Sequence, residues 1–290
     1  MVIVAGIFWG TMGVFSNELN SLGFNSMENS AIRLITCALV FVILNFRKLK
    51  IDPRDIWKFC ITGIFSILAM SLTYFESIKR SSLTIASILL YTAPIMVTVM
   101  SAIFYKEKIT PVKLLCLVGA ILGIVLISGT GGKTGLSTAG LIFGLLSGFS
   151  YALYSILGKM ILKKYEPFTL FTYAFIFAAI GSCFVCDIPS IASKTIASKN
   201  IVYTVMIMAG CGIVTSAVPY TLYTLGLKYM PAGKASILAC VEPLTATIIG
   251  ISFYGDRLGV VSANGIVLII SSVVVISLFK THSAPSNGKQ

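Results

Sequence analysis

A carboxylate in the middle of an apolar run is the feature of this sequence best suited to chemistry. Glu242 lies near the centre of the run 232–254 and directly precedes Pro243. A charge at the centre of a bilayer costs about 3 kcal/mol, so such a residue usually faces other helices or a water-filled cavity. A carboxyl group can also bind and release a proton. We therefore predict a substrate or proton site at Glu242; the alternative is a carboxyl that only hydrogen-bonds between helices.

A basic residue, Arg33, is expected inside the apolar run 27–46. At a rise of 1.5 Å per residue it lies roughly 10 Å from the start of that run. Its guanidinium could hold a substrate carboxylate through two parallel hydrogen bonds. Two alternatives stay open: an ion pair with a membrane acid such as Glu242 or Glu28, and extension of the side chain to the outer surface.

Aromatic side chains recur in the apolar runs where they could line a cavity. Tyrosine combines an apolar face with one hydroxyl, which suits an amphipathic ligand. We predict that the cavity is lined by Tyr220, Tyr223, Tyr91 and Trp9.

Two prolines, Pro94 and Pro243, stand in the middle of apolar runs. Each lacks a backbone N–H and leaves the carbonyl four residues earlier, at Leu90 or Ala239, without its helical partner. Such carbonyls could bind substrate or a cation, and a broken helix can act as a hinge. We predict hinges at both prolines, with a static kink as the alternative.

The elements that position these residues follow from composition. The chain has 290 residues, of which 57% are hydrophobic and 11% charged. Soluble domains carry about 25% charged residues, so lipid must be the solvent for most of this chain. The net charge of +12 comes from lysines and arginines in short connections between apolar runs, which is typical of membrane topology and argues against a nucleic-acid partner.

Residues that could support enzymes or metal sites are placed unfavourably. The seven cysteines lie in or beside apolar runs, and the one histidine, His282, is in the tail. Buried cysteines of this kind behave as small hydrophobic residues. We expect no catalytic site, no metal site and no cofactor.

Ten apolar runs are long enough to cross the hydrocarbon, which takes about 20 residues of helix. They cover roughly 2–19, 27–46, 57–77, 84–104, 112–129, 139–158, 168–187, 201–226, 232–254 and 260–279. With the N-terminus in the cytoplasm, most of the 22 lysines and arginines fall in cytoplasmic segments. The positive-inside rule therefore predicts that both termini are cytoplasmic.

An internal repeat organises these runs. Residues 60–128 match residues 209–277 without a gap, 149 positions further on: Tyr74 falls on Tyr223 and Pro94 on Pro243. Each half contains five runs, an odd number, so the halves must be inverted in the membrane. We predict an all-α integral membrane protein of ten transmembrane helices in two inverted five-helix repeats, 1–135 and 136–280, with a disordered cytoplasmic tail at 281–290. Inverted repeats of this kind support alternating access.

Several motifs together resemble the EamA family of the drug/metabolite transporter superfamily. They are Trp9-Gly10, Arg33, Leu90-Tyr91-Thr92-Ala93-Pro94, Val241-Glu242-Pro243, and the two span ends Phe104-Tyr105-Lys106-Glu107-Lys108 and Phe253-Tyr254-Gly255-Asp256-Arg257. Family members usually read Gly-Glu-Arg at such span ends, so Lys106 and Asp256 depart from the pattern. The resemblance implies an inner-membrane carrier, often an exporter of amino acids or other small metabolites.

The function predicted from the sequence is secondary active transport. We expect a proton-coupled exporter of amino acids or related amphipathic metabolites that works by alternating access in the cell (inner) membrane. A passive exchanger or uniporter without proton coupling is the alternative, and a lipid scramblase is a more remote one. The expected partners are a small-molecule substrate, a proton and the lipid bilayer; the oligomeric state stays open, and a monomer is compatible with the sequence.

Overall fold

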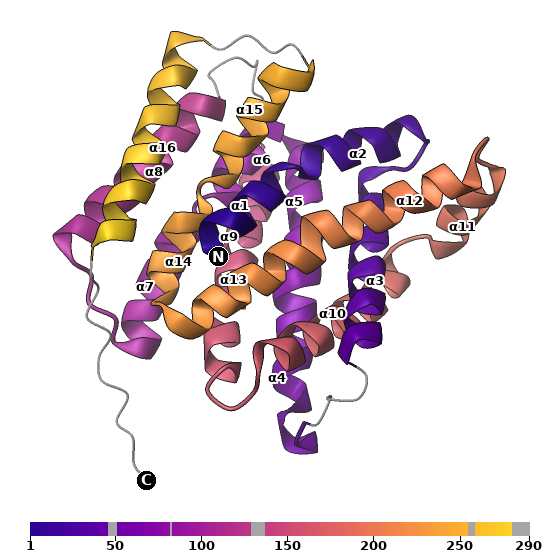
Figure 1. The fold of residues 1–290 in the computed structure, drawn as a ribbon, viewed down its shortest axis with the longest axis horizontal. Helices are drawn as coiled ribbons and strands as arrows, with labels where there is room; N and C mark the ends of the chain where they lie inside the picture. The colour runs from indigo at the N-terminus through magenta and orange to yellow at the C-terminus, as the bar shows by residue number, and fades with distance from the viewer. Residues whose placement is uncertain (46–50, 82, 129–136, 255–258, 280–290) are drawn as a thin grey trace.

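The computed structural model describes residues 1–45, 51–81, 83–128, 137–254 and 259–279, and every regular element in these ranges is helical (Figure 1). The predicted tail 281–290 and Asp256-Arg257 lie outside the described residues. Up to residue 128 the elements are α1 (Val2–Gly10), α2 (Met12–Ser21), α3 (Ser26–Asn45), the 3₁₀ turn η1 (Pro53–Asp55), α4 (Ile56–Ile61), the π-helical η2 (Thr62–Leu68), α5 (Ala69–Arg80), α6 (Leu83–Leu90), α7 (Ala93–Tyr105) and α8 (Pro111–Ser128).

The second part of the chain continues in the same way. Its elements are α9 (Thr138–Ile161), α10 (Pro167–Val185), α11 (Ile188–Ala197), α12 (Ile201–Gly212), the π-helical η3 (Ile213–Ala217), α13 (Val218–Tyr229), α14 (Ala232–Ala239), α15 (Glu242–Tyr254) and α16 (Val260–Leu278). Helix α11 occupies a segment that the sequence suggested was only a connection. It forms because Asp187 caps its start, accepting a hydrogen bond from Ser190 N at 3.0 Å, and because Pro189 falls in the first turn, where no backbone donor is needed.

Among the described residues, eight helical segments are long and apolar enough to cross a membrane. Two further apolar stretches, Pro111–Leu126 and Ala263–Leu278, are shorter, and the helices that contain them, α8 and α16, pack side by side (Figure 1). Large apolar side chains such as Leu115, Phe184 and Phe253 are exposed on the outside of the molecule. A surface this apolar is stable in a lipid bilayer rather than in water. The prediction of an all-helical integral membrane protein is therefore confirmed.

Two long helices are broken at matching places. The chain leaves helical geometry between Leu90 and Ala93 and again between Ala239 and Glu242. Pro94 and Pro243 are each the second residue of the helix that resumes, where a missing N–H costs nothing. Helices α5, α6 and α7 begin and end 149 residues before α13, α14 and α15, so the offset found in the sequence recurs in the helix bounds.

A glycine faces each break from a neighbouring helix. A Cβ added at Gly6 of α1 would lie 3.1 Å from the Ala239 carbonyl oxygen, and one at Gly148 of α9 would lie 3.2 Å from the Leu90 carbonyl oxygen. Small residues let helix backbones approach closely in membranes. Helices α1 and α9 therefore pack directly against the two broken helices and fix the position of the carbonyls that the prolines release.

Candidate functional site

A cavity of about 100 Å³ lies beside the two helix breaks. Helices from both parts of the chain line it with one carboxylate, one guanidinium, several aromatic rings and two methionines. The lining residues are Trp9, Met12, Arg33, Met70, Ser71, Tyr74, Phe75, Ser87, Leu90, Tyr91, Tyr151, Tyr220 and Glu242. Of the side chains predicted to bind substrate or protons, the structure thus brings Glu242, Arg33, Trp9, Tyr91 and Tyr220 around one space.

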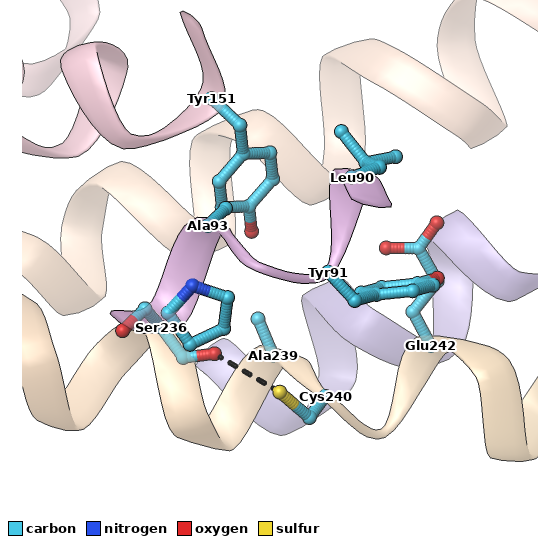
Figure 2. A pocket seen from close by; sticks show the side chains of 9 residues that line it. Leu90, Tyr91, Ala93, Tyr151, Ser236, Ala239, Cys240 and Glu242 are labelled. Atoms are coloured by element: carbon cyan, nitrogen blue, oxygen red, sulfur yellow. Dashed lines mark hydrogen bonds between the residues drawn. The ribbon is translucent and has the colours of Figure 1, made fainter. Parts of the chain in front are cut away.

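Glu242 is the first residue of α15 and stands at the edge of the second break. Its side chain is half-buried, and the Tyr91 hydroxyl, from the first break, lies against its carboxyl group (Figure 2). The free N–H groups and the dipole at a helix start favour a negative charge there. The two breaks consequently meet at the carboxyl group of Glu242, at the edge of the cavity.

Arg33 faces the same cavity and has no ion partner among the described residues. Its guanidinium is buried and donates to Ser71 Oγ at 2.9 Å and to Met12 Sδ at 3.3 Å, while Nε has no hydrogen-bond partner among the described residues. In the ranges that the structure describes, no carboxylate lies within 4 Å of the guanidinium, although its charge is near enough to act on Glu242. A buried guanidinium with spare donors is suited to bind an anionic group of a ligand.

Several aromatic rings that line the cavity pack against one another. The Trp9 ring stands edge-on to Tyr220, with ring centroids 5.3 Å apart, and Tyr151 lies 6.2 Å away. Tyr223 was predicted to line the cavity, but it belongs to neither cavity lining. Its ring is buried behind Trp9, 5.4 Å away, and its hydroxyl is hydrogen-bonded to Ser155 Oγ at 2.7 Å.

A second, much smaller cavity of about 20 Å³ adjoins the first between the two helix breaks (Figure 2). Leu90, Tyr91, Tyr151 and Glu242 line both spaces. The residues that line only the small one are Ala93, Pro94, Ser236, Ala239 and Cys240. The predicted hinge Pro94 thus contacts this space, whereas Pro243 lines neither.

An ion cluster around Glu107 joins four helix ends on one side of the molecule. The Glu107 carboxylate accepts hydrogen bonds from Lys159 Nζ at 2.8 Å, from Lys113 Nζ at 3.3 Å and from the backbone N–H of Ala232 at 3.0 Å. Lys113 is almost fully buried. Burial alone would raise the pKa of Glu107, but the Lys159 hydrogen bond and the charges of both lysines outweigh it and hold that pKa below its usual value.

The Glu107 cluster is a polar network that the sequence did not single out. Glu107 appeared there only as part of a motif at a span end, because two of its three partners, Lys159 and Ala232, are 52 and 125 residues away. Tyr105 reinforces the contact, since its hydroxyl donates to the Ile156 carbonyl at 2.6 Å. These bonds tie the ends of α7 and α9 to the starts of α8 and α14.

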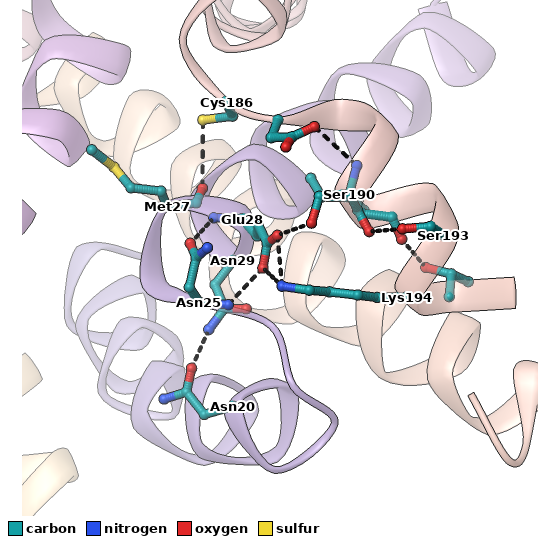
Figure 3. A network of polar contacts seen from close by, with 12 residues as sticks. Asn20, Asn25, Met27, Glu28, Asn29, Cys186, Ser190, Ser193 and Lys194 are labelled. Atoms are coloured by element: carbon teal, nitrogen blue, oxygen red, sulfur yellow. Dashed lines mark hydrogen bonds and ion pairs between the residues drawn. The ribbon is translucent and has the colours of Figure 1, made fainter. Parts of the chain in front are cut away.

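A second polar network lies where α3 begins (Figure 3). Glu28 accepts from Lys194 Nζ at 2.7 Å, from Ser190 Oγ at 2.7 Å and from Asn25 N at 2.7 Å, and its own N–H donates to Asn25 Oδ1. The reciprocal pair with Asn25 is a capping box. Because Lys194 neutralises Glu28, this acid is not the partner of Arg33.

Comparison with known proteins identifies the family. The model of the EamA-like transporter family matches residues 1–129 and 138–278. The chain belongs to this family. It is 26% identical to an uncharacterized transporter of Archaeoglobus fulgidus, covering 94% of each chain, and 22% identical to the uncharacterized inner membrane transporter YicL of Salmonella typhimurium, covering 96% of this chain and 94% of that protein.

The fold is also similar to that of a solved protein. A crystal structure superposes on 96% of each chain with a TM-score of 0.77 at 14% sequence identity. The protein is therefore a multi-pass membrane transporter of the EamA-like family, and its relatives carry the names of transporters rather than of enzymes.

Proposed function

We propose that the protein is a proton-coupled exporter of amino acids or related amphipathic metabolites and that it works by alternating access. The observation that supports the proposal is the cavity in which Arg33 and the carboxyl group of Glu242 share an aromatic lining, with no ion partner for Arg33 in the part of the chain that the structure describes. A zwitterion with an apolar side chain complements such a cavity in charge and in polarity.

In this proposal, each part of the substrate has a complementary group in the lining. The substrate carboxylate binds the Arg33 guanidinium, which is held in position by Ser71. The ammonium group lies near Glu242 and the faces of the surrounding aromatic rings, which attract cations. The apolar side chain contacts Met12, Met70 and other residues of the wall, and methionine adapts to side chains of different shape.

Proton coupling follows from competition at Glu242. A protonated Glu242 has no charge with which to hold the ammonium group, whereas the carboxylate binds it. Proton binding on one side of the membrane therefore releases substrate there, and proton release on the other side restores the binding site. Tyr91, next to the carboxyl group, is placed to stabilise either form by a hydrogen bond.

Alternating access requires two halves that can rock against each other. We assign these halves to residues 1–135 and 136–280, with ten transmembrane helices, inverted topology and hinges at Pro94 and Pro243. The 149-residue offset between the helix bounds of the two parts supports this assignment. With both termini in the cytoplasm, the cavity faces the outer half of the membrane and the Glu107 cluster closes the cytoplasmic end.

Two experiments test the proposal. A panel of amino acids is first screened for thermal stabilisation of the purified protein, because a ligand of the native state raises its apparent stability. Uptake or release of the best ligand is then measured in proteoliposomes with and without a pH gradient. We expect Glu242→Gln to bind ligand weakly and to lose the response to the gradient.

Glu28→Gln is the matched control, since Glu28 is also a buried acid but lies outside the cavity. It should lower the melting temperature while leaving coupling intact. Gradient-driven transport that persists in Glu242→Gln would contradict the role of Glu242. Wild-type transport that is indifferent to the gradient would identify a passive exchanger instead.

A further inference from the structure

The Arg33 guanidinium donates one of its hydrogen bonds to a methionine sulfur. Met12 Sδ accepts from Arg33 Nη1 at 3.3 Å, and Ser71 Oγ accepts from Nη2 at 2.9 Å. A thioether is only a weak acceptor, so the contact with Met12 satisfies Nη1 poorly. A carboxylate that enters the cavity can therefore displace the sulfur from Nη1 easily.

Met12 reaches Arg33 because the helix is interrupted between α1 and α2. Helix α1 ends at Gly10 and α2 begins at Met12, while the Thr11 hydroxyl between them donates to the Phe8 carbonyl oxygen at 2.7 Å. The Met12 side chain is partly buried and lines the large cavity. A water molecule needs roughly 10–15 Å³, so a cavity of about 100 Å³ also admits hydrogen peroxide, which is only slightly larger than water.

We propose that Met12 is a site of reversible oxidative modification and that its sulfoxide blocks the binding of a carboxylate to Arg33. The oxidant is a peroxide. A lone pair of the Met12 sulfur attacks one peroxide oxygen, an S–O bond forms and the O–O bond breaks. With hydrogen peroxide, the departing oxygen takes up the proton of the transferred oxygen and leaves as water, so the sulfur is oxidised and the peroxide is reduced. The effect on binding rests on the function proposed above, whereas the oxidation itself does not.

Oxidation converts the weak contact between Met12 and Arg33 into a strong one. Because the sulfur is already 3.3 Å from Nη1, an added oxygen can lie about 2.8 Å from Nη1, a usual length for a charge-assisted hydrogen bond, without movement of the sulfur. The S–O bond is polarised toward oxygen, and the guanidinium charge stabilises that oxygen. The sulfoxide thus binds the donor that a substrate carboxylate would use. Methionine sulfoxide reductases can restore the thioether.

Two other methionines separate the contributions of the cavity and of Arg33. Met70 lines the same cavity, but its sulfur accepts no hydrogen bond from the described residues. Met96 is partly buried like Met12, but it lines neither cavity. Oxidation of Met70 should therefore leave Arg33 available, and Met96 should react slowly because the peroxide has no cavity through which to reach it.

The first experiment follows oxidation of the purified full-length protein in detergent. The protein is treated with hydrogen peroxide, and the sulfoxide content of each methionine peptide is measured over time by mass spectrometry. We expect Met12 to be oxidised at least about tenfold faster than Met96, because susceptibility follows exposure to the oxidant. Equal rates at Met12 and Met96 would overturn the assignment of Met12.

The second experiment measures affinity for the amino acid that best stabilises the untreated protein. Wild type, Met12→Leu and Met70→Leu are each compared with and without peroxide, so that every variant is its own reference. Wild type and Met70→Leu should lose affinity at least about tenfold and regain it after treatment with methionine sulfoxide reductases, whereas Met12→Leu should not respond to peroxide. An equal loss in Met12→Leu, or full affinity in wild type that carries Met12 sulfoxide, would overturn the proposal.

A third measurement needs no ligand. In Met12→Gln the amide oxygen takes the place of the sulfoxide oxygen, whereas Met12→Leu leaves the buried Arg33 Nη1 without this acceptor. Met12→Gln should therefore melt at a higher temperature than Met12→Leu, and the reverse order would contradict the contact between the sulfoxide and Arg33. If no amino acid stabilised the untreated protein, rapid oxidation of Met12 together with this melting order would uphold the modification site and reject the function proposed above.

Discussion

Replacement of Gly10 by alanine tests whether close packing of α1 holds Glu242 in place. A Cβ at Gly10 would lie 2.5 Å from Thr245 Cβ and 2.7 Å from the Glu242 carbonyl oxygen. Both atoms belong to α15. Neither the Glu242 carbonyl oxygen nor the Thr245 Cβ can be moved by a side-chain rotation, so the backbone of α15 would have to shift. Overpacking of this kind costs about 1–3 kcal/mol and displaces the neighbouring backbone.

Gly13→Ala is the matched control for this substitution. A Cβ at Gly13 would meet nothing within 4 Å, and neither glycine has a positive φ. Both variants gain the higher helix propensity of alanine, about 1 kcal/mol in a helix interior, so the difference between them isolates the clash. We expect Gly10→Ala to be less stable than Gly13→Ala by about 1–3 kcal/mol.

The assay measures the melting temperature in detergent and the affinity for the best amino acid of the thermal-shift panel. Gly10→Ala should lower both, because α15 carries Glu242, whereas Gly13→Ala should leave the affinity unchanged. Equal melting temperatures and affinities for the two variants would show that α1 does not position α15. Reduced stability with full affinity would show that the displaced helix does not carry a binding residue.

Two further predictions concern the charged groups. Arg33→Lys should bind the selected amino acid at least about tenfold more weakly, because an ammonium group cannot form the bidentate contact with a carboxylate; affinity that matches the wild type in calorimetry would rule out this contact. Glu107→Gln should lower stability by about 3 kcal/mol at neutral pH, since it leaves Lys113 buried without its charged partner. The folded pKa of Glu107 is lowered, so its stabilising effect is complete above its ordinary pKa of 4.5 and is lost as the pH falls through the lower folded value. The difference in melting temperature between wild type and Glu107→Gln should therefore shrink in acid, and a difference that is independent of pH would contradict this account.

Much of this protein can be read from local features of the sequence. Composition identifies lipid as the solvent because 11% charged residues cannot cover a soluble surface of this size. Pro94 and Pro243 locate the helix breaks, since a proline is tolerated in the first turn of a helix but not in its interior. Glu242 is recognisable as a cavity residue because an isolated carboxylate in a bilayer needs water, a proton or a polar partner.

Other features were decided only by the tertiary structure, because they depend on partners far away in the chain. Tyr220 and Tyr223 have the same sequence context, yet Ser155 binds the hydroxyl of Tyr223 and leaves only Tyr220 at the cavity. Glu28 could have paired with Arg33, but it is bound instead by Lys194, which lies 166 residues further along the chain. The sequence by itself determined which groups are costly to bury in lipid, while tertiary packing decided which of them are satisfied by other residues and which face the cavity.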